Sequence, residues 1–403
     1  MSEMPSSSRD IMPDLIRAFA LIGIVMVNVE AFSTNMGLGF QHSDGGSLDH
    51  WAIWLTAGLF TLKSYSLFSM MFGAGLGYQM ASAERKSVAF APSYFRRMAG
   101  LLFLGLMHVI FLFLGDILVT YAILGCILYL VRNGSPRDFV IWAVVLIALQ
   151  TIILLGMSGL LWVMETIDDP SIRAEFEQGM AEQTEIMLAQ DEVFEGGSFL
   201  QVAGVRLQML PALPPAVIMT QGISAFGFFL LGLTFFRTGL ISDPFAKFWW
   251  WSRWVLLPIG VIASLGAAGI YAGSEDRQSA ETLFAMGLLM GASAFSSLGY
   301  AGLIAKICQF RVGSILRFLA RGGSATLSAY LLQSVILSFV TLEFGLGLYN
   351  QLNAFEAALI ALATGLFTLS FVSIWLLFFK RGPMEILLRR WTYLGAPQAK
   401  TWS

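Results

Sequence analysis

The sequence predicts an all-α fold, a polytopic transmembrane helical bundle of about ten spans with both termini on the cytoplasmic side. Hydrophobic residues make up 57% of the 403 residues and charged residues 12%, whereas soluble globular domains contain about 25% charged residues. Several apolar runs reach the roughly 20 residues that a helix needs to cross a bilayer. Lys and Arg also gather in alternate connecting segments, which is typical of multi-pass membrane proteins.

Ten apolar segments account for the predicted crossings. The second is too long for one straight helix, so we expect it to divide near Lys63 into an interfacial piece with Trp51 and Trp54, followed by a crossing helix. In chain order the segments are 15–33, 51–81, 94–113, 116–132, 138–163, 213–236, 248–272, 280–305, 323–343 and 353–379.

The distribution of positive charge predicts the orientation. With a cytoplasmic N-terminus, the outer segments hold only Arg173, Arg206 and Arg277 of the 24 Lys and Arg residues. One missed crossing would reverse the side of every later loop, so this bias favours the proposed order of spans. The first residues lack the basic region of a cleaved signal peptide. We therefore expect a multi-pass membrane protein in contact with the lipid bilayer.

The chain divides into two helical halves, 1–163 and 213–403, around the acidic outer segment 164–212. This segment predicts one surface helix that begins at Asp169-Pro170, because Asp is a favoured N-cap and Pro suits the first helical turn. The segment is either a solvated cap or a lid over an outward-facing site.

Composition also narrows the class of partner. The chain has no basic tract and no zinc-type Cys/His spacing, so neither nucleic acid nor a metal is expected. Cys126 and Cys308 lie in or beside apolar segments far apart, which predicts buried thiols and no disulfide. Glycine faces and abundant aromatic residues permit a homodimer without requiring one.

Polar residues inside apolar segments are costly in a bilayer and often mark function. Asp14 and Arg17 share a helix face, where they form a helix-end ion pair or take part in binding. Asn28 forms either a hydrogen bond between helices or a substrate contact. Lys63 is the most costly of these residues. Ser69 follows it on a segment whose glycines predict close helix packing.

His108 and Asp116 flank a short turn between two predicted spans, in the outer half of the bundle. A neutral histidine beside a carboxylate suits a general base, because the carboxylate fixes its tautomer. The alternative is a buried structural histidine, with Asp116 as the cap of the next helix. His42 and His50 lie in the outer loop 34–50 and are solvated residues or reserve candidates for the same role.

The C-terminal half contributes fewer candidates. Gly322-Gly323 is predicted to open a helix, whose free backbone N–H groups could bind an anion on the cytoplasmic side. Tyr330 and Gln333 share a face of that helix and bind substrate or join helices. Residues 382–390 predict a short amphipathic helix on the inner membrane surface.

Five motifs occur in the order typical of one family: DLIRAFALIGIVMVN (14–28), KSYSLFSMMFGAG (63–75), RRMAGLLFLGLMHVIFLFLGDIL (96–118), SAYLLQS (328–334) and GPMEILLRR (382–390). Together they resemble the YeiB-like bacterial membrane proteins, whose C-terminal half is a domain of unknown function. That family usually has Gly-Arg-Met before the Tyr-Leu-x-Gln element, where this chain has Gly322-Gly323-Ser324. If that arginine binds a ligand, either this protein binds the ligand differently or Arg321 replaces the arginine here.

The N-terminal pattern is distantly similar to transmembrane acyltransferases of the heparan glucosaminide N-acetyltransferase type, on Asp14, Arg17 and Asn28. This resemblance implies transfer of an acyl group from cytosolic acyl-CoA to an acceptor across the membrane, with a histidine near the outer side. The acyltransferase pattern favours His42 or His50 for that role, and the YeiB-like pattern favours His108.

The resemblance therefore implies an acyltransferase that uses acyl-CoA, such as acetyl-CoA, and a small-molecule or glycan acceptor. We expect the catalytic residues to be His108 and Asp116. The expected substrate-binding residues are Asn28, Lys63, Ser69, Tyr330 and Gln333. The cofactor phosphates are expected to bind Arg17, Arg96, Arg97 and Arg321. The alternative is a transporter or exporter in which Lys63, His108 and Asp116 line a polar path without chemistry.

Overall fold

The computed structural model describes residues 11–35, 37–40, 46–85, 87, 89–274, 276–310 and 312–394. Every regular element in these ranges is a helix, which confirms the predicted all-α fold. The first helices are α1 (Ile11–Ser33), α2 (Ser47–Leu59), α3 (Lys63–Arg85), α4 (Phe90–Phe111), α5 (Leu118–Val131) and α6 (Pro136–Thr166). They are followed by α7 (Pro170–Gly196), α8 (Phe199–Met209), α9 (Leu213–Val217) and α10 (Ile223–Arg237). The remaining helices are α11 (Lys247–Trp251), α12 (Leu257–Gly273), α13 (Ala280–Cys308), α14 (Ser314–Gly323), α15 (Thr326–Thr341), α16 (Ala354–Phe378) and α17 (Pro383–Thr392).

Within the described ranges, 7 helical segments are long and apolar enough to cross a membrane, or 8 if α14 and α15, which meet at 85°, form one broken span. The protein is therefore a multi-pass membrane protein. The prediction of about ten spans also counts α3, which is rich in Ser and Gly, and α5, which has 14 residues. Those two crossings and the cytoplasmic position of the termini stay predictions.

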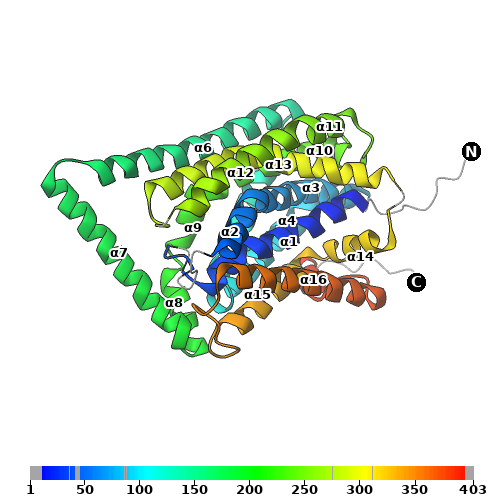
Figure 1. Cartoon of the computed structure of the whole chain (residues 1–403). Coiled ribbons are helices and arrows are strands. Elements are labelled where there is room, and N and C mark those ends of the chain that lie inside the picture. The colour runs from blue at the N-terminus through cyan, green and yellow to red at the C-terminus, as the bar shows by residue number, and fades with distance from the viewer. Residues whose placement is uncertain are drawn as a thin grey trace, which may run out of the picture.

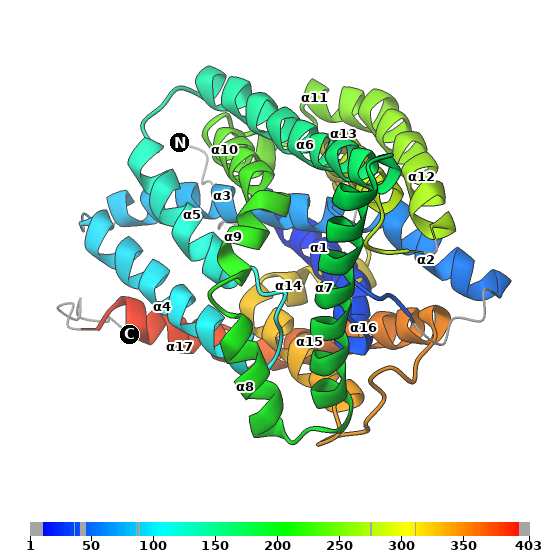
Figure 2. The same cartoon turned by 90° about the vertical axis from the view of Figure 1, so that its left-hand side faces the viewer.

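The helices surround α1, which lies in the middle of the bundle in Figure 1. Helix α7 runs across one end of the bundle, and Figure 2 looks onto that end. The first residues of α1 and the end of the described chain lie at the other end (Figure 1). Following the predicted orientation, we call the end covered by α7 and α8 the outer end and the end where α1 begins the inner end.

Glycines allow α3 and α10 to touch along their backbones. A Cβ atom on Gly73 would lie 2.0 Å from the carbonyl oxygen of Phe229, and one on Gly232 would lie 1.8 Å from that of Met70. Small residues let helices approach closely enough for dispersion contacts, which drive helix association in lipid. The close packing predicted for the glycines of α3 is therefore confirmed.

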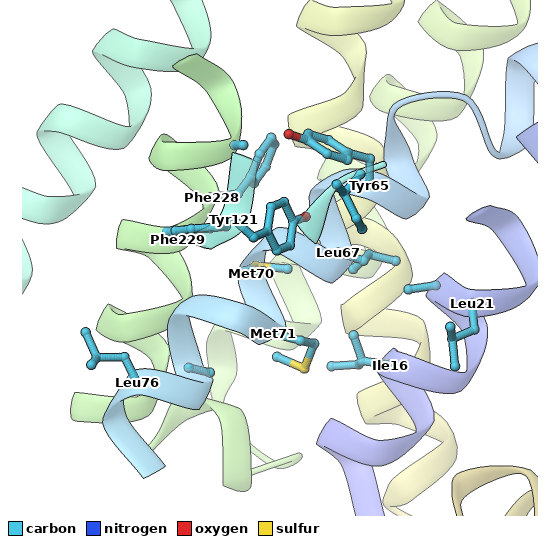
Figure 3. Packing of buried hydrophobic residues seen from close by; sticks show 14 of the residues in the cluster. Ile16, Leu21, Tyr65, Leu67, Met70, Met71, Leu76, Tyr121, Phe228 and Phe229 are labelled. Atoms are coloured by element: carbon cyan, nitrogen blue, oxygen red, sulfur yellow. The ribbon is translucent and has the colours of Figure 1, made fainter. Parts of the chain in front are cut away.

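The buried core joins α1, α3, α5 and α10. Figure 3 shows apolar side chains from these helices in mutual contact, among them Ile16, Leu21, Leu67, Met70, Tyr121, Phe228 and Phe229. The ring of Tyr121 meets Phe229 edge to face, with 4.9 Å between the centroids. Aromatic pairs of this geometry add to the packing energy. This core fixes α5, and with it the turn that precedes α5.

The predicted division of the second apolar segment is confirmed. Helix α2 ends at Leu59 and α3 begins at Lys63, with Leu62 in the left-handed backbone region (φ 66°). The indole Nε1 of Trp54 donates to the carbonyl oxygen of Leu265, and Trp51 is exposed. The position of α2 at the membrane interface stays a prediction.

The outer segment holds two helices, where one was predicted. Helix α7 begins as expected, because Oδ1 of Asp169 accepts hydrogen bonds from the Ser171 and Ile172 amides. These bonds, and first the one from the Ser171 hydroxyl, hold the pKa of Asp169 below its usual range. The second helix, α8, packs beside the end of α4, where Phe199 stacks on Phe111.

Candidate functional site

The turn between α4 and α5 brings His108 and Asp116 together. The imidazole Nδ1 of His108 lies 2.7 Å from Oδ1 of Asp116, and Oδ2 of the same carboxylate accepts from the Val119 amide at 2.8 Å. Both side chains are almost fully buried, with 2% of His108 and 4% of Asp116 exposed. Asp116 therefore holds the imidazole of His108 with one carboxylate oxygen and caps α5 with the other. Both contacts that were predicted as alternatives occur together.

Gly105 makes this turn possible. A Cβ atom at this position would lie 2.7 Å from the Val119 nitrogen and 3.0 Å from Oδ2 of Asp116. Any larger side chain would push the start of α5 away from α4. The contact between His108 and Asp116, which are eight residues apart, thus depends on a glycine one turn before His108.

The carboxylate assigns the tautomer of the imidazole. A carboxylate only accepts hydrogen bonds, so Nδ1 of His108 carries the proton and Nε2 presents a lone pair. Within the part of the chain that the structure describes, Nε2 is buried and has no hydrogen-bond partner. A buried lone pair held in a fixed direction is the geometry of a general base.

Tyr330 of α15 forms one wall of this site. Its ring centroid lies 5.1 Å from that of His108, and its buried hydroxyl lies beside the backbone of Ile117. Gln333, one turn further along α15, donates instead to the carbonyl oxygen of Leu21 and to the Thr368 hydroxyl. Tyr330 therefore belongs to the histidine site, whereas Gln333 joins α15 to α1 and α16.

The other predicted substrate-binding residues lie apart from the pair. The Ser69 hydroxyl shares a 2.6 Å hydrogen bond with the Tyr121 hydroxyl of α5. Lys63 is fully buried and donates from Nζ to the Ala57 carbonyl oxygen at 2.9 Å. Asn28 is half-buried on α1. These observations place Ser69 and Lys63 in contacts between helices.

The reserve histidines are not part of a buried site. His50 is exposed on α2, and His42 lies outside the described residues. The structure adds one acidic residue that the sequence reasoning missed. Glu30 lies two residues after Asn28, and it lines a small cavity of about 30 Å³ together with Thr56 and Tyr271. Its position as a charged residue inside the first apolar segment could have marked Glu30 as a candidate from the sequence.

A larger cavity opens at the inner end of the bundle. It has a volume of about 400 Å³, and we call it the basic cavity after three of its lining residues, Arg317, Arg321 and Lys380. Asp14 also lines it and forms a 2.9 Å ion pair with Arg17. Of the arginines predicted to bind a cofactor, the structure therefore places Arg321 at the cavity and brings Arg17 to it through Asp14.

Arg96 and Arg97 do not line the basic cavity. Nη1 of Arg96 donates to the carbonyl oxygen of Leu394, and Arg97 lies within electrostatic reach of Glu385 on α17. Lys380, which was not predicted, takes a place at the cavity because α16 ends there. Positive charge at the inner ends of spans follows from topology alone, so the sequence could not tell these arginines apart.

The predicted anion site at Gly322-Gly323 is wrong. Helix α14 continues through both glycines and ends at Gly323. Glycine is needed at these positions because α1 and α16 approach closely: a Cβ on Gly323 would lie 2.1 Å from the Asp14 carbonyl oxygen. The next helix begins at Thr326, and Glu385 occupies its N-terminus. Oε1 of Glu385 accepts from the amides of Leu327 and Ser328, at 2.8 and 3.2 Å.

The predicted amphipathic helix at 382–390 thereby gains a role. It is present as α17, with Pro383 in its first turn, and it carries the carboxylate that caps α15. The Ser328 hydroxyl donates to Oε2 of the same carboxylate. A negative charge at a helix N-terminus is stabilising, so α17 fixes the position of the helix that carries Tyr330.

Helix α15 connects the basic cavity with the histidine site. Ser324 lines the cavity, and Tyr330 packs on His108. Tyr330 is four residues beyond the start of α15 at Thr326, which corresponds to about 6 Å along a helix axis. The stretch from Ser324 to Tyr330 therefore links the basic cavity, which opens at the inner end, with the histidine site.

These features define a class: a multi-pass helical membrane protein with a buried histidine–carboxylate pair near its outer end and a basic cavity at its inner end. Residues 235–395 match the family described as "Protein of unknown function (DUF418)". The chain is 29% identical over 399 residues to "Uncharacterized protein YxaH" of Bacillus subtilis, covering 95% of this chain and 94% of that protein. It is 25% identical over 404 residues to "Uncharacterized protein YeiB" of Escherichia coli, covering 97% and 98%. No solved structure matches the chain.

The resemblance to the YeiB-like family is therefore confirmed, and the chain is an integral membrane protein whose residues 235–395 match the DUF418 family. The relatives are bacterial proteins. Their names mention neither acyl transfer nor transport.

Proposed function

We propose that the protein is a transmembrane acyltransferase of the bacterial inner membrane. It takes an acyl group from acyl-CoA, such as acetyl-CoA, at the inner end and delivers it to a hydroxyl or amine of a small-molecule or glycan acceptor at the outer end. The observation that carries this proposal is the His108–Asp116 pair, in which Nδ1 is held by the carboxylate and Nε2 is left without a partner.

The proposed chemistry is general-base catalysis of acyl transfer. Nε2 of His108 takes the proton of the acceptor hydroxyl or amine as that atom forms a bond to the thioester carbonyl carbon. The carbon–sulfur bond then breaks, and the imidazolium returns the proton to the leaving thiolate of CoA. Asp116 stabilises the imidazolium and holds the ring in place.

The basic cavity supports the other half of the proposal. Guanidinium groups bind phosphate oxygens with paired hydrogen bonds, and CoA carries several phosphate charges. Arg317, Arg321 and Lys380 supply three cations around one opening of about 400 Å³. The short path along α15 would then lead from the phosphates toward His108.

The histidine site is closed in this structure. Because only 2% of His108 is exposed, the substrates can reach Nε2 only if a wall moves. Tyr330 is the side chain proposed to move, since its ring lies directly against the imidazole of His108. A closed resting site would also keep water away from the thioester.

The test uses inside-out membrane vesicles, in which the cytoplasmic face and the basic cavity meet the medium. Vesicles from cells that express the protein receive radiolabelled acetyl-CoA, and label in lumenal or lipid products is measured. We expect transfer that falls about 10²- to 10⁴-fold in His108→Ala, the range for loss of a general base. His50→Ala, in the exposed histidine of α2, is the matched control and should transfer at the normal rate.

Two other outcomes would change the account. Loss of transfer in His50→Ala with normal transfer in His108→Ala would assign the base to His50 on α2. The absence of any label transfer above vesicles without the protein would refute the acyltransferase. Arg321→Met gives a second readout, because it should raise the KM for acetyl-CoA while leaving kcat nearly unchanged.

A further inference from the structure

Arg206 is a buried cation at the outer end that the proposed function does not use. It lies on α8, and only 4% of the residue is exposed. Long cationic side chains normally extend their charged end into water. A buried guanidinium therefore calls for a group that compensates its charge.

The surroundings of Arg206 do not supply that group. Its guanidinium carbon lies 5.3 Å from the ring centroid of Phe194, on α7. The carboxylate of Asp191, also on α7, accepts from the Tyr349 hydroxyl at 2.7 Å and from the Asn350 amide at 3.3 Å. Across the described ranges, no acidic side chain lies within ion-pair distance of Arg206, and its buried Nε has no hydrogen-bond partner.

The physical cost of this arrangement points to a missing partner. Burial lowers the pKa of Arg206 to about 10, which still leaves the side chain charged at neutral pH. An unpaired buried charge is strongly unfavourable, and an apolar residue of similar size would fill the same space at lower cost. A cation–π contact of about 0.5–2 kcal/mol compensates only part of it.

Exposed apolar side chains on α8 and on the loop after α15 indicate the source of such a partner. Leu200 and Leu207 of α8 are exposed, and so are Phe344 and Leu346 in the loop after α15. Exposed apolar residues beside a cation are typical of a segment at the membrane interface, where headgroup phosphates lie. Planar guanidinium groups bind phosphate with two parallel hydrogen bonds.

We propose that Arg206 anchors a phosphate-binding site between α8, α7 and the loop after α15, at the outer end of the bundle. The ligand is the phosphate group of a lipid headgroup or of a soluble molecule on the outer side. This site is separate from the basic cavity and would exist whether or not the protein transfers acyl groups.

The test measures thermal unfolding of the detergent-purified full chain, since a ligand that binds only the folded state raises the midpoint. The starting protein carries Arg317→Met and Arg321→Met, which weakens anion binding at the basic cavity. One arm adds inorganic phosphate and the other adds short-chain phosphatidylglycerol. Arg206→Met is compared with Arg173→Met, because Arg173 is an exposed arginine of α7 that pairs with Glu177.

We expect phosphate or the lipid to raise the unfolding midpoint. Arg206→Met should need about tenfold or more ligand for the same rise, as for a lost charge-assisted hydrogen bond. Arg173→Met should respond like the starting protein. A response to the lipid alone assigns the site to a headgroup, and a response to inorganic phosphate assigns it to a soluble ligand. Arg206→Lys keeps the positive charge but lacks the planar guanidinium, so it should bind the ligand with intermediate affinity. This variant tests the site if Arg206→Met does not fold.

Two results would overturn the proposal. One is the same stabilisation by phosphate or lipid in Arg206→Met as in the starting protein. The other is no stabilisation of the starting protein by either ligand, together with an Arg206→Met variant that is at least as stable. Arg206 would then be a structural residue held by Phe194.

Discussion

Replacing Asp116 with asparagine separates the two tasks of this carboxylate. Asparagine has one oxygen where aspartate has two, and both oxygens of Asp116 are in use. If the remaining oxygen keeps the Val119 amide, the new NH₂ group faces Nδ1 of His108. The imidazole must then accept at Nδ1 and carry its proton on Nε2, which removes the proposed base.

The magnitude follows from the lost contact. Hydrogen bonds to charged groups contribute about 1.5–3 kcal/mol, so Asp116→Asn should lower the free energy of unfolding by about that amount. The rate of acetyl transfer should fall about 10²- to 10⁴-fold, as for loss of a general base. The fold should persist because α5 keeps its cap.

Nitrogen-15 NMR of histidine-labelled protein measures the tautomer directly. The chain has 3 histidines, so replacing His42 and His50 by asparagine leaves one signal. We expect a proton on Nδ1 in the parent and on Nε2 in Asp116→Asn. The matched control is Asp49→Asn, because the buried Asp49 carboxylate accepts from the Phe355 amide of α16 and belongs to α2, not to the turn that holds the pair. The same tautomer in parent and Asp116→Asn would refute the reasoning.

Three further predictions concern the helices that hold the sites. Glu385→Ala removes the cap of α15 and should lower the free energy of unfolding by about 1–3 kcal/mol, with reduced acetyl transfer; normal activity and stability would contradict this role. Gly323→Ala forces a Cβ against the Asp14 carbonyl and should cost about 1–3 kcal/mol, whereas Gly75→Ala, where a Cβ meets open space, should be neutral or stabilising. The pKa of Asp169 is lowered in the folded chain, so its stabilisation of α7 is present at neutral pH and is lost as the pH falls below the usual Asp range. Faster hydrogen exchange of the amides at the start of α7 in acid measures that loss. Wild-type exchange that does not change with pH would contradict the prediction. So would an Asp169→Ala variant whose amides exchange no faster than those of the wild type at neutral pH.

The sequence was most informative where the deciding contacts are local. His108 and Asp116 are eight residues apart across one turn, so hydropathy and turn residues were enough to identify their contact as possible. The break near Lys63 and the cap at Asp169 are local for the same reason. Charge bias and apolar length likewise predicted a multi-pass bundle without any knowledge of packing.

Contacts between distant segments were beyond that reasoning. The interaction of Glu385 with Leu327 joins positions 58 residues apart, and no local pattern marks the glutamate as a cap for another helix. The glycines at 322 and 323 are compatible with a helix start and with close packing, and only the approach of α1 and α16 decides between them. Arg206 has an ordinary sequence context, and its burial depends on how α7 and the loop after α15 fold over it.

The most direct test of the central claim is a density map of the detergent-purified protein with a non-hydrolysable thioether analogue of acetyl-CoA. We expect the nucleotide phosphates among Arg317, Arg321 and Lys380, with the pantetheine arm beside α15 and the acyl group near Nε2 of His108. A map with an empty basic cavity, or with the nucleotide bound elsewhere and its acyl group far from His108, would contradict the acyltransferase proposal.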